Sequence, residues 1–268
     1  MSDDRRIPGS NALGRRGFLT VMGAAGAVIS APAIARKSEG KFTSEVGRKL
    51  YADGRVHPFR GNTVICHIDQ QGPNNNFFEA LLDIYRQLPA LRFAPKITAL
   101  PPSSYHMTIF GGANHPERKP GLWPTSIPLD TPIEECTRIL GERLEKAKLG
   151  SIAPIRMCVD LSDPVERENP FTIRLLPIDD TENQRLRALR NKLSEILEIR
   201  SQSHDSYRFH VTLAYLIRTL DRSELREFQA SYKAQHAEVA RRCPVIEFGQ
   251  PEYCSLEDMF HFKRLSFV

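Results

Sequence analysis

Cysteine and tryptophan are scarce in this 268-residue chain, which has five cysteines and one tryptophan. The number of cysteines is odd and none form a C-x-x-C pair, so the sequence excludes a closed disulfide framework and offers no zinc-ribbon spacing. A strong excess of one charge is also missing, because 37 basic and 32 acidic residues give a net charge of +5. This balance weakly favours anionic ligands and does not mark a nucleic-acid-binding protein.

Long hydrophobic runs are absent as well. The apolar stretch at 18–34 is rich in Gly and Ala, and it is shorter and less apolar than a membrane-spanning helix needs. Over the whole chain, apolar residues make up 41% and charged residues 26%, which excludes a disordered or fibrous protein. A globular chain of this length forms one two-lobed domain or two small ones.

The N-terminal segment is predicted to be an export signal and not part of the folded domain. The run Gly14-Arg15-Arg16-Gly17-Phe18-Leu19-Thr20 resembles the twin-arginine export signal, and the apolar stretch after it ends in the small-x-small sequence Ala33-Ile34-Ala35. We therefore expect a signal peptide at 1–35, export by the twin-arginine machinery, and a periplasmic domain at 36–268 without stable membrane association. An uncleaved N-terminal membrane anchor is the alternative.

Hydrophobic periodicity in the remaining chain predicts two similar halves, at roughly 60–165 and 166–268. Each half contains strands that alternate with helices, and capping pairs mark the helix starts at Thr131, Thr181 and Asp221. The expected strands are 63–68, 104–110, 155–161, 171–178, 207–217, 245–248 and 260–268. This order predicts an α+β, bilobal fold in which each lobe has a mostly antiparallel sheet covered by helices, with a pseudo-two-fold cleft between the lobes.

Two H-x-T motifs occupy matching places in the two halves: His106-Met107-Thr108 and His210-Val211-Thr212. In a strand, side chains two residues apart project from the same face. The His and Thr of each motif therefore share one face, while apolar neighbours such as Met107 and Val211 lie on the other. We expect the four polar side chains to point into the cleft.

This set of side chains suits phosphodiester hydrolysis. Histidine titrates near neutral pH, so a neutral imidazole can accept a proton from water while a protonated one donates to the leaving oxygen. The hydroxyls of Thr108 and Thr212 can donate hydrogen bonds to phosphoryl oxygens, and no metal or other cofactor is required. One H-x-T motif alone is more often a satisfied core pair; two copies in equivalent contexts favour His106 and His210 as catalytic residues.

The sequences Ser104-Tyr105-His106-Met107-Thr108-Ile109-Phe110 and Phe209-His210-Val211-Thr212-Leu213 resemble the 2H phosphoesterase superfamily, which is named for two H-x-[ST] motifs. The residues at 61–65, 101–108 and 258–260 are similar to the sequences of its DUF1868-type branch. The resemblance covers roughly 60–268. It implies a bilobal fold and activity on cyclic nucleotides, on cyclic phosphate ends of RNA or on ADP-ribose cyclic phosphates.

Several residues outside the motifs are candidate substrate contacts. Tyr105 adjoins the first motif, and the Pro/Gly-rich loop at 111–130 contains Arg118 and Trp123, which could bind a phosphate and stack on a base. Ordinary surface-loop chemistry is the alternative for these two. Arg174 could reach the cleft or lie in solvent, and His67 shows no metal-ligand spacing and is expected to be structural or exposed.

The predicted partner is a small phosphodiester or nucleotide. RNA ends are possible but not favoured, because an export signal and a 20-residue loop after the first motif distinguish this chain from RNA-processing relatives. Two other functions stay open. A binding protein could use the same cleft without turnover, and a metallohydrolase could use His106 and His210 as ligands, although no carboxylate or third His stands at a useful spacing.

Overall fold

The computed structural model describes residues 40–72, 75–162 and 171–268, which belong to a compact unit running from Ser38 to Val268. The predicted export segment and its cleavage site at Ala35 lie outside the described residues. Within the described ranges, no helix is long and apolar enough to cross a membrane.

The described residues of this unit form four α-helices and nine strands. The helices are α1 (Asn75–Gln87), α2 (Ile133–Ala147), α3 (Asp180–Leu197) and α4 (Arg222–Arg242), and four short 3-10 helices occur at Leu88–Ala90, Ala94–Lys96, Pro102–Ser104 and His115–Glu117. The strands are β1 (Gly61–His67), β2 (Ile97–Ala99), β3 (His106–Asn114), β4 (Ile155–Val159), β5 (Phe171–Pro177), β6 (His210–Leu216), β7 (Ile246–Phe248), β8 (Glu252–Asp258) and β9 (His261–Phe267).

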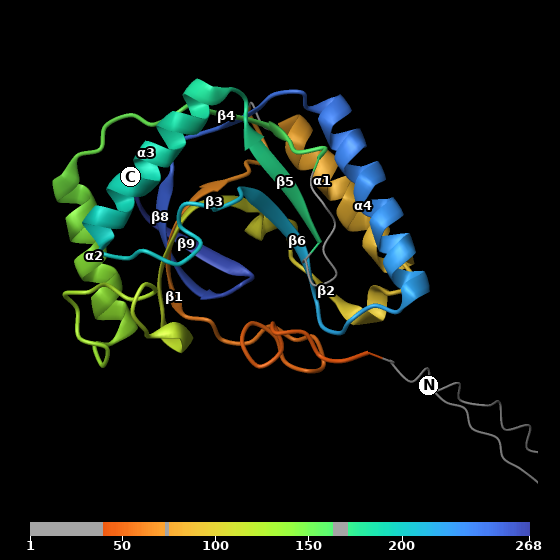
Figure 1. Ribbon diagram of the computed structural model, residues 1–268, viewed down its shortest axis with the longest axis horizontal. Coiled ribbons are helices and arrows are strands. Elements are labelled where there is room, and N and C mark those ends of the chain that lie inside the picture. Colours follow the sequence, from red (N-terminus) through yellow and green to blue (C-terminus); the bar gives the residue numbers. More distant parts are fainter. Residues whose placement is uncertain (1–39, 73–74, 163–170) are drawn as a thin grey trace, which may run out of the picture. The chain divides into compact units, whose positions relative to one another are not determined.

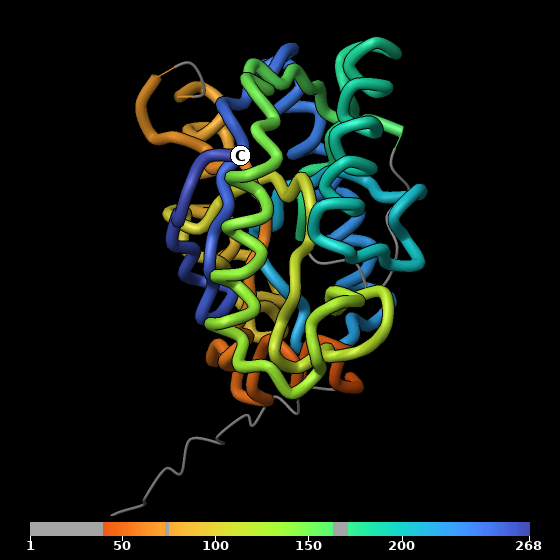
Figure 2. The backbone as a smooth tube through the Cα atoms, turned by 90° about the vertical axis from the view of Figure 1, so that its left-hand side faces the viewer, coloured from red at the N-terminus to blue at the C-terminus, as the bar shows by residue number. Residues whose placement is uncertain are grey.

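The strands form one curled sheet in the order β7-β4-β5-β6-β3-β1-β8-β9, and β2 pairs with β6 beside this path. Every pairing of these strands is antiparallel. Figure 1 shows the helices on two sides of the sheet, α1 with α4 on one side and α2 with α3 on the other. Figure 2 shows α2 and α3 side by side from the flank. The predicted α+β class with a mostly antiparallel sheet is confirmed.

The sheet does not divide at the midpoint of the chain. β4 precedes residue 166 but pairs with β5 and β7, while β8 and β9 end the chain but lie next to β1. Each end of the sheet therefore contains strands from both sequence halves. The two motif-bearing strands, β3 and β6, are neighbours at its centre, and a two-fold relation between the lobes stays a prediction.

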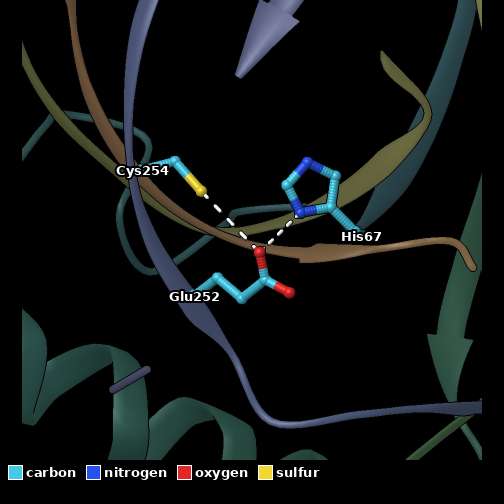
Figure 3. A group of neighbouring side chains, drawn as sticks. All are labelled: His67, Glu252 and Cys254. Carbon is cyan, nitrogen blue, oxygen red and sulfur yellow. Dashed lines mark hydrogen bonds and ion pairs between the residues drawn. The ribbon is translucent and has the colours of Figure 1, made fainter. Parts of the chain in front are cut away.

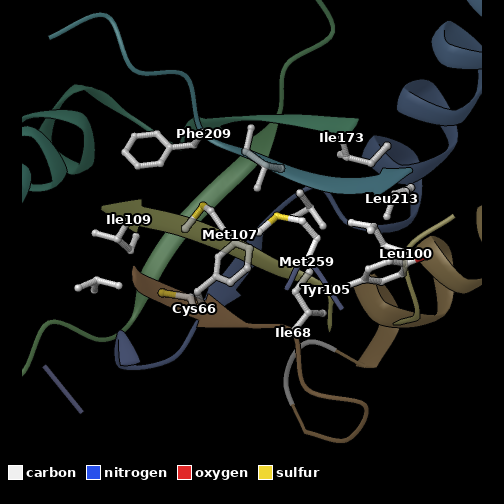
Figure 4. Close-up of a cluster of buried hydrophobic side chains, with 14 of the residues drawn as sticks. Cys66, Ile68, Leu100, Tyr105, Met107, Ile109, Ile173, Phe209, Leu213 and Met259 are labelled. Carbon is white, nitrogen blue, oxygen red and sulfur yellow. The ribbon is translucent and has the colours of Figure 1, made fainter. Parts of the chain in front are cut away.

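The alternation predicted for the motif strands is present. Met107, Ile109, Val211 and Leu213 are fully buried, whereas the His and Thr of each motif are partly exposed. Figure 4 shows Met107, Ile109 and Leu213 in a cluster of buried apolar side chains. Burying a Leu or Ile side chain contributes about 1.5–3 kcal/mol, so the register of both strands is fixed by their apolar residues and the motif face follows from it.

Helix starts were predicted with mixed success. Asp221 is the N-cap of α4, where its carboxylate accepts from the backbone of Glu224 and completes a capping box. For α3, the prediction of Thr181 as the cap was wrong. Asp179 lies in the extended conformation that an N-cap needs and accepts from the backbone of Glu182, so the helix begins earlier.

Two further predictions differ from the structure. α2 has Pro132 as its N-cap and makes no side-chain cap bond, so the capping box expected at Thr131 is absent from this helix. The first motif strand continues to Asn114, because residues 111–114 pair with β1 instead of opening the loop at 111. The strand β8, which lies between β1 and β9, was not expected, although it pairs with β1 over five residues.

Candidate active site

The two H-x-T motifs lie side by side at the centre of the sheet. Met107 of β3 is paired with Val211 of β6 in antiparallel register. Around this pair, His106 lies toward Thr212 and Thr108 lies toward His210. Directly opposed side chains in such a pair have Cβ atoms about 4.5–5.5 Å apart, and diagonal ones about 7–8 Å. The structure thus brings all four predicted motif residues to one face of neighbouring strands.

Both motif histidines are held in the same way. His106 Nδ1 lies 2.7 Å from the carbonyl of Ser104, and His210 Nδ1 lies 2.9 Å from the carbonyl of Arg208. A carbonyl oxygen can only accept, so Nδ1 carries the proton in each ring and Nε2 is the nitrogen that does acid–base chemistry. The backbone two residues before each histidine therefore fixes both its tautomer and its orientation.

His106 lies in surroundings that favour its neutral form. The pKa of His106 is lowered to about 4, chiefly by burial and also by the nearby His67 and His210, while the hydrogen bond to the Ser104 carbonyl opposes the shift. The ring of Phe262 packs against the imidazole with centroids 4.3 Å apart and shields one side from water. A neutral His106 at pH 7 is suited to accept a proton.

The outer neighbours of the motif strands add two polar side chains to the site. For Arg174 the sequence left both the cleft and solvent open, whereas His67 was expected to be structural or exposed. His67 of β1 is paired with His106, and Arg174 of β5 is paired with His210. The Arg174 guanidinium lies 3.3 Å from His210 Nδ1. Each motif histidine therefore has a second nitrogen-bearing side chain directly across from it on the adjacent strand.

Tyr207 connects the two motifs. A hydrogen bond joins its hydroxyl to that of Thr108, and its ring centroid lies 6.1 Å from that of His210. The buried guanidinium of Arg190 lies over the Tyr207 ring at 4.1 Å and donates to the carbonyl of Ile109, the residue after Thr108. These contacts hold Thr108 through its hydroxyl and through the backbone of the next residue. Nothing in the local sequence pattern marked Tyr207 or Arg190.

The motif threonines have different neighbours. Thr172 of β5 is paired with Thr212 of β6, and Ile65 of β1 is paired with Thr108. The Thr172 side chain is buried, and its hydroxyl has no hydrogen-bond partner within residues 40–72, 75–162 and 171–268. The threonine of the second motif is therefore paired with another threonine, whereas that of the first motif is paired with an apolar side chain.

Three residues that were predicted to contact substrate make structural contacts within the protein instead. Tyr105 is 1% exposed and packs in the apolar cluster of Figure 4, on the opposite face from His106. Trp123 is 2% exposed, and its Nε1 donates to the carbonyl of Ile127. Arg118 lies over the Trp123 ring at 4.4 Å and donates to the carbonyl of Thr131 at 2.6 Å. Arg118 and Trp123 thus hold their own loop together, and the substrate roles predicted for these three are not supported by their positions.

His67, Glu252 and Cys254 form a cluster of potential metal ligands, with ligand atoms within 4.8 Å of one another. Their contacts do not favour a cation. His67 Nδ1 lies 2.7 Å from Glu252, the Arg264 guanidinium already neutralises the same carboxylate from 3.2 Å, and burial raises the pKa of the Cys254 thiol to about 12. A metal would have to break the first contact, lie near a guanidinium and deprotonate a buried thiol. The cluster is better described as a hydrogen-bonded His–Glu pair with two neighbours.

A cavity of about 410 Å³ adjoins the second motif. Arg174, Tyr207 and Arg208, all in contact with His210, line one part of it, and Arg187 lines another. Asp160 and Asp179 also reach the cavity, so its wall carries both signs of charge. This volume is large enough to hold a small organic molecule. The cavity reaches residues that contact His210, but the four motif side chains are not part of its lining.

Comparison with known proteins gives a match to one family model. A family model named 2H-phosphodiest and described as "Domain of unknown function (DUF1868)" matches residues 49–168. The matched region includes His106 and Thr108 and ends before β5. It supports the resemblance to the 2H phosphoesterase superfamily and to its DUF1868 branch. No curated protein matches the chain.

Two solved structures are similar to this chain. A conserved protein of unknown function from Agrobacterium tumefaciens shares 26% identity with a TM-score of 0.76, over 85% of this chain and 93% of the other. A protein from Thermus thermophilus shares 15% identity with a TM-score of 0.37, over 77% and 95%, and is too distant to support an argument. The first structure shares the overall fold and is itself described as a protein of unknown function.

Proposed function

We propose that this protein hydrolyses a cyclic or nucleotide-type phosphodiester, with His106 and His210 as general base and general acid. The observation that carries the proposal is the matched anchoring of the two imidazoles on neighbouring strands. Each donates Nδ1–H to the carbonyl two residues before it, and each lies across from the threonine of the other motif. Two such groups can act on a phosphorus atom placed between them.

The reaction balances without a cofactor. A water oxygen attacks phosphorus while His106 Nε2 takes one of its protons, and the bond from phosphorus to the leaving oxygen breaks as His210 Nε2–H donates to that oxygen. The products are a phosphomonoester and an alcohol, which for a cyclic substrate remain one molecule. Thr108 and Thr212 donate hydrogen bonds to non-bridging oxygens, where negative charge increases in the transition state.

The lowered pKa of His106 supports its assignment as the base. The two roles must be held by rings in different protonation states at the same pH. His106 is the ring that burial and its histidine neighbours keep neutral. His210 then takes the acid role and protonates the leaving oxygen.

The cavity beside His210 supports a small anionic substrate. Its guanidinium groups from Arg174, Arg187 and Arg208 can meet phosphate or sugar oxygens, and its volume of about 410 Å³ suits a nucleotide-sized molecule better than a polymer. We therefore favour a small phosphodiester over an RNA end.

Membership of the 2H phosphoesterase superfamily and a two-fold arrangement are part of the proposal. The sheet order reads β3-β1-β8-β9 outward from the centre on one side and β6-β5-β4-β7 on the other. Helix contacts follow the same scheme, because α1 packs with α4 and α2 packs with α3. These correspondences support an approximate two-fold axis through the pair Met107 and Val211.

The place of action is proposed from the sequence of the N-terminus. The twin-arginine run at Arg15 and Arg16 and the Ala-x-Ala ending at Ala35 support export to the periplasm, with the export machinery as a transient partner. A periplasmic enzyme of this kind would act on phosphodiesters outside the cytoplasm.

A turnover screen tests the activity. The purified protein is offered 2′,3′-cyclic nucleotides, 3′,5′-cyclic nucleotides and oligoribonucleotides with cyclic phosphate ends, with and without excess chelator. We expect hydrolysis of a small phosphodiester at equal rates in both conditions. Loss of activity in chelator that zinc restores would contradict the mechanism, and tight product binding without any turnover would identify a binding protein instead.

A further inference from the structure

A third imidazole lies on the face of the sheet that carries the motifs. His67 is the last residue of β1 and is paired directly with His106 of β3. Directly paired residues share a face, and their Cβ atoms are about 4.5–5.5 Å apart. The influence of His67 on the pKa of His106 agrees with this closeness. His67 therefore lies within reach of any group that contacts His106.

The orientation of His67 is set by a buried carboxylate. Glu252 of β8 is 8% exposed, and its Oε2 lies 2.7 Å from His67 Nδ1. The other oxygen, Oε1, accepts from Arg264 at 3.2 Å. Although burial opposes ionisation, the hydrogen bonds from His67 and Arg264 lower the pKa of Glu252, so the carboxylate is ionised and accepts the Nδ1 proton of His67.

This contact leaves Nε2 as the nitrogen of His67 that meets a ligand. Figure 3 shows one ring nitrogen of His67 directed at Glu252 and the other directed away from it. All three imidazoles of the site thus have Nδ1 bound to protein and present Nε2. A buried carboxylate costs several kcal/mol unless it is paired, so a fixed His–Glu pair at this place points to a functional use of the ring.

The opposite half of the site has a cation at the matching position. Arg174 is paired with His210 on β5, as His67 is paired with His106 on β1. A phosphoryl group between the two motif histidines would therefore lie between Arg174 on one side and His67 on the other. Non-bridging phosphoryl oxygens are strong acceptors for both kinds of donor.

We propose that His67, oriented by Glu252, binds a non-bridging oxygen of the substrate phosphoryl group from the side opposite Arg174. This inference rests on the proposed phosphodiesterase function and adds a binding residue to it. It also defines the recognised group as a phosphoryl group with two donors on opposite sides. Glu252 acts through His67 and is a positioning residue.

Variants of His67 separate binding from scaffolding. His67→Gln keeps a polar side chain but removes the ring nitrogen, and we expect inorganic phosphate to bind about 10- to 100-fold more weakly by calorimetry. His67→Arg restores a hydrogen-bond donor for phosphate, which is the role of Arg174 on the opposite side, and its guanidinium can also pair with Glu252. Phosphate affinity of this variant should therefore stay within about fivefold of wild type. His261→Gln, an exposed histidine on β9, is the matched control and should leave affinity unchanged.

The same variants are assayed for turnover of the best phosphodiester from the screen. Loss of a binding contact made in the ground state should raise KM for His67→Gln more than it lowers kcat. If the wild type turns over substrate and His67→Gln matches it in KM and in phosphate affinity, the role of His67 is wrong while the proposed function stands.

If the wild type turns over no phosphodiester, the proposed function fails, and the phosphate titration still decides the role of His67. Failure of the wild type to bind phosphate would overturn the inference. Should His67→Gln not fold, an NMR titration of the wild type gives the answer, because phosphate must shift the His67 Hε1 resonance. An unchanged His67 resonance alongside shifted His106 and His210 resonances would overturn it.

Discussion

At the scale of single residues, His106 has the most distinctive environment in the site. Burial lowers its pKa from 6.5 to about 4, so it stays neutral well into the acidic range. Since kcat/KM reports the free enzyme, its acid limb should fall near pH 4–5 instead of near 6.5. The check is a pH–rate profile together with NMR titration of the His106 Hε1 resonance, assigned from its absence in His106→Ala. A titration midpoint near 6.5 would contradict the assignment of His106 as the base.

The same shift affects stability with a defined sign. The unfolded chain takes up a proton at His106 near pH 6.5, whereas the folded protein does so only near pH 4. Between these values the unfolded state binds more protons, so the contribution of His106 makes the protein less stable as the pH falls from 6.5 toward 4. His106→Gln should reduce this part of the pH dependence, and denaturant melts of both proteins at pH 7 and pH 5 measure it. An equal loss of stability in the two proteins would contradict the lowered pKa.

Arg118 provides a test of the corrected loop assignment. Its guanidinium is bound to the carbonyls of Leu129 and Thr131 and lies over Trp123. We expect Arg118→Gln to lower the free energy of unfolding by about 0.5–1.5 kcal/mol, because two loop carbonyls lose a charged donor and the Trp123 ring loses its cation. Turnover should stay within about threefold of wild type. A large rise in KM with unchanged thermal stability would show that Arg118 contacts the substrate.

At the scale of elements, the caps of α3 offer a matched pair of variants. Asp179 caps the helix through the Glu182 backbone, whereas Thr181 is exposed within its first turn. Asp179→Ala should destabilise the protein by about 1 kcal/mol, and Thr181→Ala should cost a few tenths at most. Chemical denaturation of both variants measures the difference. A greater loss in Thr181→Ala would show that the helix begins where the sequence predicted.

Most elements were predictable because their signals are local. The alternation of Met107 and Ile109 with His106 and Thr108 defines a strand and its faces within four residues. The cap at Asp221 is likewise encoded by residues that touch in the folded chain and are close in sequence. The strand β8 was missed because its position between β1 and β9 depends partly on pairing with β1, which lies near the other end of the chain.

The motif residues of the site were predictable, but their supporting residues were not. His106 and His210 carry a repeated pattern that can be recognised without a structure. His67 has no such pattern, and its partner Glu252 is 185 residues away in sequence. Tyr207 and Arg190 contact Thr108 and its neighbour only through tertiary packing. By contrast, Arg118 and Trp123 were candidates for substrate contacts because of their residue types, whereas in the structure they contact each other and carbonyls of their own loop.

At the scale of the whole molecule, the expected route out of the cytoplasm can be tested directly. Replacing both Arg15 and Arg16 by Lys should stop periplasmic appearance, because the twin-arginine receptor reads the arginine pair. Cell fractionation with an immunoblot measures the distribution, and N-terminal sequencing of the exported protein should begin at Arg36. Unchanged export of the double variant would exclude this route, and a retained N-terminus would favour a membrane anchor.

The central claim is that His106 and His210 perform the chemistry together, and the kcat of their variants tests it most directly. We expect His106→Ala and His210→Ala each to lower kcat by about 10²–10⁴, with the double variant close to the weaker single one because the two rings act as a unit. Product affinity should change little in the same proteins, which separates lost catalysis from a collapsed site. Turnover at the wild-type rate in the double variant would contradict the account.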